Sequence, residues 1–337
     1  MNPSRLSLSI ALSDNPNTRP LIDGDVTPEG ISLTPTAIHP SEMFWRQLRF
    51  AEFDVSEMSM SSLLISTSRG TPLGSTPWVA LPVFTTREFF HTRILVRADA
   101  GISAPADLKG KRVGVPEYQQ TAAIWGRGVL ENEFGVRPRD MEFFMERVAD
   151  KSHGGATGFK PPAGVTVNQI PASTNIGEML VSGELDATLL YLTDRNLVDR
   201  SRIDLGADKR VRPLFPDRAA EGRRYYAKTG IYQINHTVVI RRTLFEQHPW
   251  IALNLYSAFA AARAQVLRAG TTALASHLET GVVGEDVRRA LALDPMAYGV
   301  TATRKVLETI ADYVHAQGLT DRRVMIEELF APVSMDL

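Results

Sequence analysis

Short apolar runs alternate with segments of helical periodicity along most of this 337-residue chain. Residues 6–12 place apolar side chains at every second position, which is the pattern of a β-strand. Residues 121–134 carry apolar side chains at helical spacing and precede Gly135, which predicts a helix that ends there. Strands that alternate with helices in this way predict an α/β fold.

The same patterns predict further elements. Strands are expected at 30–34, 53–58, 78–84, 93–96, 110–116, 141–144, 165–170, 185–191 and 235–240. Helices are expected at 41–50, with Ser41 as the cap, at 59–66 and 176–182, and almost throughout 244–329. Residues 153–164 hold four glycines and two prolines and are expected to form a loop.

Composition excludes several classes of protein. The 37 Lys and Arg residues nearly balance the 38 Asp and Glu residues, which gives a net charge of −1 and no global field for nucleic acid or an acidic membrane. The chain has no cysteine, so disulfides and thiolate chemistry are excluded. No zinc-binding spacing occurs among the seven histidines, so no metal is expected. The N-terminus lacks a secretory pattern, which predicts a cytoplasmic protein.

Two motifs resemble the type II periplasmic-binding-protein fold. They are the run Asp107–Pro116, which is similar to the entry of the second lobe, and the helix-to-strand turn Gly183–Ala187. The resemblance implies a two-lobed α/β protein with a ligand cleft between the lobes. Lobe one is expected to hold residues 1–95 and 240–337, and lobe two residues 96–239.

A narrower resemblance is to the 4,5-dihydroxyphthalate decarboxylases. It is carried by the segments 53–59, 87–91, 121–128, 234–240 and 248–250 and extends over nearly the whole chain. It implies a carboxy-lyase of phthalate degradation that converts 4,5-dihydroxyphthalate without oxidation to 3,4-dihydroxybenzoate (protocatechuate) and CO2. Hydroxyls para to the carboxylates make the substrate its own electron source, so no cofactor is expected.

The implied partner is a small aromatic dicarboxylate, and its charges call for guanidinium groups or helix N-termini. The expected helix start offers Thr121 and Ala122 as carboxylate contacts. Arg19 and Arg87 are the favoured anchors, followed by Arg127 and then Arg46. Trp125 and Tyr191 are expected to contact the ring. Each also has a plainer interpretation, because single arginines usually form surface ion pairs and aromatic residues usually belong to the core.

His91, His236 and Glu57 are the candidates for proton transfer. The two histidines lie beside the expected crossings between lobes, where the cleft floor should be, and Glu57 ends an expected strand. Histidine suits acid or base work near neutral pH. The alternative interpretation is that these residues are packed and hydrogen bonded, with Glu57 capping a helix or pairing with an arginine.

Other functions remain open on the sequence alone. The main alternative is a solute-binding protein for a small aromatic or anionic ligand, which would use the same fold without chemistry. A thiamine-pathway pyrimidine synthase would need a Cys-rich motif, and a regulatory protein would need a helix-turn-helix before the first strand; neither is found. The oligomeric state is open, a homo-oligomer being one possibility.

The absence of a metal-binding motif makes a first prediction. Decarboxylation should survive exhaustive chelation, measured as CO2 release before and after dialysis against EDTA. Loss of activity that one divalent ion restores would show that Glu57, Asp194 and a histidine converge on a metal instead.

Overall fold

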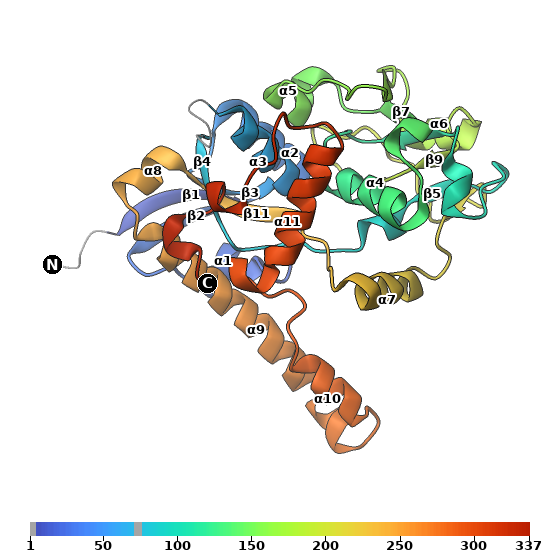
Figure 1. Ribbon diagram of the computed structural model, residues 1–337. Coiled ribbons are helices and arrows are strands. Elements are labelled where there is room, and N and C mark those ends of the chain that lie inside the picture. Colours follow the sequence, from blue (N-terminus) through green and yellow to red (C-terminus); the bar gives the residue numbers. More distant parts are fainter. Residues whose placement is uncertain (1–4, 71–75) are drawn as a thin grey trace.

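The strands of the protein form two separate sheets, as seen in a computed structural model that describes residues 5–70 and 76–337 (Figure 1). The first sheet has the order β2-β1-β3-β11-β4. It consists of β1 (Leu6–Leu12), β2 (Ile31–Ala37), β3 (Val55–Ser59), β4 (Trp78–Leu81) and β11 (His236–Arg241). The second has the order β10-β5-β9-β6-β7-β8. It consists of β5 (Leu95–Arg97), β6 (Arg112–Val115), β7 (Glu142–Met145), β8 (Thr166–Gln169), β9 (Ala187–Thr188) and β10 (Val211–Pro213). The expected α/β fold is confirmed.

Helices surround each sheet and complete two lobes. Lobe one carries α1 (Arg19–Ile22), α2 (Pro40–Phe50), α3 (Met60–Arg69), α8 (Arg242–Gln247), α9 (Ile251–Glu279), α10 (Glu285–Leu291) and α11 (Val300–Ala316). Lobe two carries α4 (Thr121–Phe134), α5 (His153–Thr157), α6 (Ile176–Ser182) and α7 (Arg218–Thr229). The end of α9 and α10 project from the body of the molecule (Figure 1). Within the described ranges, no helix is both long and apolar enough to cross a membrane.

The sheet of lobe one mixes parallel and antiparallel strands. β1 runs parallel to β2 and β3, whereas β11 runs antiparallel to β3 and β4. Pro35 lies in β2, at the edge of the sheet, where a residue without an amide hydrogen costs no ladder bond. The returning strand β11 places His236 opposite Ser59, so the end of the chain's second crossing meets the end of β3.

Two segments cross between the lobes and lie side by side. The first follows β4 and the second links α7 to β11. They join where the Asn235 amide donates to the Thr86 carbonyl at 2.9 Å and the Glu88 amide to the Gln233 carbonyl at 3.2 Å. Because β11 already belongs to the first sheet, the second crossing lies before His236. The boundary expected at residue 240 therefore falls inside β11.

Helix α11 belongs to lobe one but packs on both lobes. It contacts α3 of lobe one and α4 of lobe two, where the Tyr313 ring meets the Trp125 indole edge-on with centroids 5.5 Å apart. Gln317, just past α11, accepts from the buried Arg127 at 2.9 Å. Buried apolar residues of both lobes form one continuous core cluster. The hinge region is thus covered by packed side chains.

Three local features differ from the sequence expectations. The expected loop at 153–164 begins with the short helix α5, whose first amides are satisfied by side-chain acceptors. The strand expected at 185–191 is reduced to the two residues of β9. Helix α2 is capped by His39 rather than Ser41, since the His39 Nδ1 accepts from the Ser41 amide at 3.3 Å.

Two glycines of α4 provide a test of the contact with α11. A Cβ at Gly128 would overlap the Tyr313 ring, whereas a Cβ at Gly126 would meet nothing within 4 Å. We expect Gly128→Ala to lower the free energy of unfolding by about 1–3 kcal/mol, as overpacking usually does. Gly126→Ala is the matched control and should be neutral or stabilising by up to about 1 kcal/mol, because alanine favours helix. Urea denaturation measures both, and equal effects would contradict the packing.

Candidate active site

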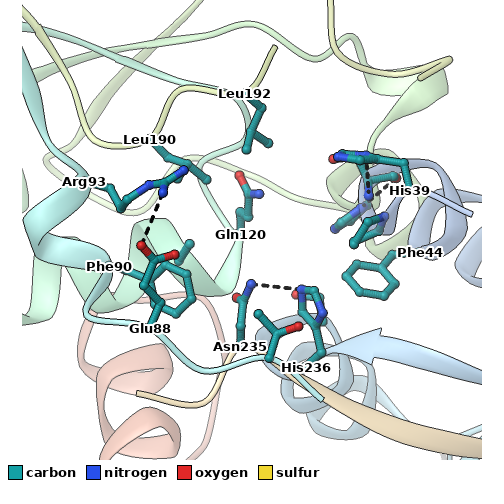
Figure 2. A pocket seen from close by; sticks show the side chains of 16 residues that line it. His39, Phe44, Glu88, Phe90, Arg93, Gln120, Leu190, Leu192, Asn235 and His236 are labelled. Carbon is teal, nitrogen blue, oxygen red and sulfur yellow. Dashed lines mark hydrogen bonds and ion pairs between the residues drawn. The ribbon is translucent and has the colours of Figure 1, made fainter. Parts of the chain in front are cut away.

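A cavity of about 140 Å³ lies between the lobes, enclosed by the starts of α2, α3 and α4 and by the two crossing segments (Figure 2). Its lining is His39, Pro40, Ser41, Phe44, Ser59, Thr86, Glu88, Phe90, Arg93, Gln120, Ala122, His153, Leu190, Leu192, Asn235 and His236. The volume is roughly ten times what one water molecule needs. Aromatic walls with a few convergent polar groups are typical of a small-molecule site.

The carboxylate of Glu57 lies directly behind this cavity. Glu57 is on β3 and has no exposed surface. It accepts hydrogen bonds from the Ser13 amide at 2.7 Å, the Ser13 hydroxyl at 2.6 Å and the Thr85 hydroxyl at 2.5 Å. Burial alone would raise the pKa of Glu57, but the bonds and charge of His236 and the hydroxyls outweigh it and lower the pKa below its ordinary value. The group is therefore a carboxylate at neutral pH.

His236 joins this carboxylate to the cavity. Its Nδ1 lies 3.1 Å from the Glu57 Oε2, and its Nε2 lies 2.8 Å from the Asn235 side-chain nitrogen. A carboxylate accepts only, so the Nδ1 carries the proton, and in the neutral ring the Nε2 accepts from Asn235. Phe44 packs edge-on against the imidazole, with centroids 4.7 Å apart. This pairing fixes the tautomer and leaves the Nε2 as the atom that can exchange a proton.

Figure 2 shows the imidazole of His39 at the Phe44 end of the cavity. A further imidazole, that of His153, packs edge-on against Phe44 with centroids 5.6 Å apart. Burial lowers the pKa of His39 and the pKa of His153, which favours their neutral forms. His153 is 1% exposed and its Nε2 lies 3.4 Å from the Ser41 carbonyl. Because the His39 Nδ1 accepts from the Ser41 amide, the neutral His39 ring carries its proton on Nε2, which can donate to a ligand oxygen. The His153 Nε2 faces a carbonyl and therefore carries the proton of that ring, while its Nδ1 is buried.

The start of α4 supplies main-chain donors to the cavity. The first amides of a helix have no partner inside the helix, and within the described chain no side chain caps α4. Ala122, in the first turn, lines the cavity as expected. The Thr121 hydroxyl is used differently from the expectation, since it bonds Ser59 at 2.8 Å and the Ser61 amide at 2.9 Å and so ties α4 to α3.

None of the four expected arginines is part of the cavity lining within the described chain. Arg19 and Arg46 stand at the surface, where Arg19 pairs with Asp14 and Asp23, and Arg46 with Glu42 and Glu52. These short-range carboxylates satisfy the guanidinium groups locally, because each lies within six residues along the chain.

Arg87 is half-buried and Arg127 is fully buried, and both are bonded to the protein itself. Arg87 donates to the carbonyls of Pro295 and Ala297, and burial lowers its pKa to about 10. Arg127 stacks 3.7 Å from the Tyr118 ring centroid and donates to the Tyr118 carbonyl at 2.7 Å. In the structure both side chains are engaged in packing, and their expected contact with a ligand stays a prediction.

His91 is placed in a closed cluster instead of on the cleft floor. Its Nε2 lies 3.1 Å from the Glu221 carboxylate, its Nδ1 lies 3.3 Å from the Gln233 amide, and the Tyr225 ring covers it. It is 0% exposed and is not among the cavity residues in the described chain. The expected meeting of His91 with His236 is therefore corrected: the adjacent Phe90 reaches the cavity and His91 points into the core.

The two expected ring contacts also have other partners. Trp125 is fully buried and its Nε1 donates to the Ile234 carbonyl at 2.8 Å, which fixes α4 to the second crossing. Tyr191 donates to the Ile203 carbonyl at 2.9 Å, and burial raises its pKa to about 12. Tyr191 lines a neighbouring hollow of about 230 Å³.

The sequence expectations missed most of the lining. His39, Pro40 and Ser41 had a usable signal, because a polar residue and a proline before a helical segment mark a helix start. Phe44, Glu88, Arg93 and His153 had none, since their positions depend on how the two lobes face each other. Across the described residues, no group of three or more His, Asp or Glu side chains is arranged to hold a metal ion.

Comparison with known proteins gives one relative over nearly the whole chain and a second over about half of it. A 4,5-dihydroxyphthalate decarboxylase of Comamonas testosteroni is 36% identical over 336 residues, which is 99% of this chain and 98% of that protein. A 4,5-dihydroxyphthalate decarboxylase of Pseudomonas putida is 40% identical over 186 residues, which is 55% of this chain and 70% of that protein. No protein-family model matches the chain.

Solved structures confirm the periplasmic-binding-protein-like fold. The aliphatic sulphonate binding protein SsuA of Escherichia coli superposes with a TM-score of 0.57 and 14% identity, covering 97% of this chain and 92% of that one. The alkanesulfonate-binding protein SsuA of Xanthomonas axonopodis pv. citri, bound to MOPS, gives a TM-score of 0.55 and 15% identity, covering 98% and 99%. At these identities the similarity concerns the fold alone.

The closed cluster around His91 predicts a pH-dependent stability. Burial, partly offset by Glu221, lowers the pKa of His91 from 6.5 to about 4, so between these pH values the unfolded chain binds a proton that the folded chain does not. The free energy of unfolding should fall by about 3 kcal/mol as the pH drops from 6.5 to 4, and this loss should be absent in His91→Gln. Urea denaturation of both proteins at pH 7 and pH 4.5 measures the difference. An identical loss in both would contradict the assigned burial.

Proposed function

The chain belongs to the 4,5-dihydroxyphthalate decarboxylase family, and from this premise we propose that it removes one carboxylate of 4,5-dihydroxyphthalate as CO2 and releases 3,4-dihydroxybenzoate. The observation that carries the proposal is the Glu57–His236 pair, which presents one imidazole Nε2 to the cavity between the lobes. The enzyme is a carboxy-lyase and the reaction involves no change of oxidation state.

The chemistry requires proton transfer to the ring. Direct loss of CO2 from an aryl carboxylate would leave an unstabilised carbanion. If the para hydroxyl gives up its proton, the ring carbon that bears the carboxylate becomes basic and takes a proton. The bond from that carbon to the carboxylate then breaks, its electrons return to the ring, and CO2 leaves. The ionised hydroxyl then regains the proton that it gave up, so each turnover consumes one proton from solvent in net terms, and that proton ends on the ring carbon.

His236 is the group that we assign to this transfer. Its Nε2 takes a proton and delivers it to the ring carbon, while the Glu57 carboxylate stabilises the imidazolium that forms in between. Glu57 touches no substrate and is therefore a positioning residue. Asn235, bonded to the Nε2 at 2.8 Å, holds the ring plane when the site is empty.

The other residues that line the cavity are assigned to binding different parts of the substrate. Phe44 and Phe90 provide flat apolar walls for the ring, and the Nε2 of neutral His39 donates to the oxygen of a ring hydroxyl. The free amides at the start of α4 bind a carboxylate, which the helix dipole favours. Arg19 and Arg87, which the sequence favoured as anchors, have no part in this assignment.

The kinetic test separates proton transfer from binding. We expect His236→Asn to lower kcat by about 10²–10⁴-fold, since general acid–base groups usually contribute that much. Glu57→Gln should also lower kcat. It should in addition move the pH profile of kcat toward lower pH, because the imidazolium loses its counter-charge. Steady-state rates of CO2 release and product formation measure both.

His277→Asn is the matched control, because His277 lies exposed on α9. Its kcat should stay at the wild-type value. Near-full kcat in folded His236→Asn would exclude the assigned transfer. Binding of 4,5-dihydroxyphthalate by the wild-type protein without CO2 release would favour the alternative of a solute-binding protein. The cytoplasmic location and the homo-oligomer considered above stay predictions, to be tested by cell fractionation and light scattering.

A further inference from the structure

An arginine that the sequence did not single out lines the cavity. Arg93 ends the short 3₁₀ turn Phe90–Arg93 on the first crossing segment, and its side chain is 38% exposed. Figure 2 shows Arg93 and Glu88 on one side of the cavity and His236 on the other. The cavity therefore has a guanidinium opposite the group that handles the proton.

The charges around Arg93 do not balance. Glu88 pairs with Arg93 at 3.3 Å and with Arg218, at the start of α7, at 3.0 Å. Two guanidinium groups thus share one carboxylate, and one positive charge is left over. Asp204 lines the neighbouring hollow with both arginines, but within the described chain it forms no ion pair with either and accepts from the Gly206 amide. A carboxylate entering the cavity would neutralise this excess.

The geometry of Arg93 also leaves donors available. Its bond to Glu88 uses only the Nη1, at the long end of the hydrogen-bond range. In the described chain the Nε and the Nη2 make no hydrogen bond to a protein acceptor. Guanidinium groups bind carboxylates best through two parallel N–H donors, which this fork offers.

We propose that Arg93 binds the carboxylate that the substrate keeps, and so determines that the enzyme accepts aromatic acids. This inference rests on the proposed function for the identity of the substrate. An anchor on the departing carboxylate would stabilise the ground state and oppose loss of CO2, whereas an anchor on the retained one does not. The departing carboxylate is ortho to the retained one and therefore lies on the same edge of the ring, and the carbon that bears it is the one that His236 must protonate.

The test compares ligands with and without a carboxylate. 3,4-Dihydroxybenzoate keeps the retained carboxylate, and catechol has none. We expect Arg93→Met to weaken binding of 3,4-dihydroxybenzoate by about 10–100-fold, the usual range for a charged hydrogen-bonded pair, and to leave catechol binding unchanged. Calorimetric titration measures both, and circular dichroism checks that the variant is folded.

Two further variants test whether Arg93 binds an anion or only holds the turn in place through its ion pair with Glu88. Arg218→Met removes the arginine that shares Glu88 but does not line the cavity, and it should leave binding of 3,4-dihydroxybenzoate within about 3-fold of wild type. Glu88→Gln removes the carboxylate that competes for Arg93, so binding should tighten. Weakening in Glu88→Gln equal to that in Arg93→Met would show that the pair merely holds the turn in place and would overturn the proposal.

The outcomes also separate this proposal from the proposed function. The substrate 4,5-dihydroxyphthalate carries both carboxylates. If Arg93→Met weakens its binding but leaves binding of 3,4-dihydroxybenzoate unchanged, Arg93 holds the departing carboxylate and the inference is wrong. Equal loss for catechol would indicate a general disturbance of the cavity and would also overturn it. These titrations need no turnover, so a wild-type protein that binds both acids without releasing CO2 would contradict the function and still test Arg93.

Discussion

A negative charge buried in the middle of β3 is the constraint around which lobe one is arranged. The Glu57 carboxylate has no contact with solvent, so its desolvation must be offset by protein donors. Those donors come from three separate parts of the chain: Ser13 after β1, Thr85 on the first crossing, and His236 at the start of β11. The same bonds that offset the burial of Glu57 bring a strand end, a hinge segment and an imidazole to one point. The geometry of the site is therefore a consequence of satisfying one carboxylate.

A second buried charge cluster holds the two lobes together beside the cavity. Arg147, after β7, pairs with Asp199 at 2.7 Å and Glu117 at 3.1 Å, and donates to the Ser41 hydroxyl on α2 at 2.5 Å. Burial alone would lower the pKa of Arg147, but the two carboxylates outweigh it and raise the pKa. Since one partner is in lobe one and the others are in lobe two, this cluster contributes to the cleft in which the ligand would bind.

Much of the fold follows from local sequence patterns. The bounds of β1, α4 and α6 match the expected segments, because period-two alternation, helical spacing and a glycine in the left-handed region at Gly135 are local signals. Local sequence patterns predicted the structure less well where contacts with distant residues decide it. The strand expected at 185–191 shortens to β9, and the glycine-rich segment at 153 forms α5 because Glu117, distant in sequence, accepts from its first amides.

The residues of the site divide in the same way. The sequence by itself indicated the α/β class and the family resemblance, and it named three side chains that lie at or behind the cavity: Glu57, Ala122 and His236. Only the tertiary structure decided that His91 turns into the core toward Glu221, that Arg87 and Arg127 serve packing, and that Arg93 faces the cavity. A sequence shows which residues carry charge. The direction in which each charged side chain points depends on how the two lobes face each other and on the position of the nearest buried counter-charge. Those depend on contacts between residues more than a hundred positions apart, which local patterns do not encode.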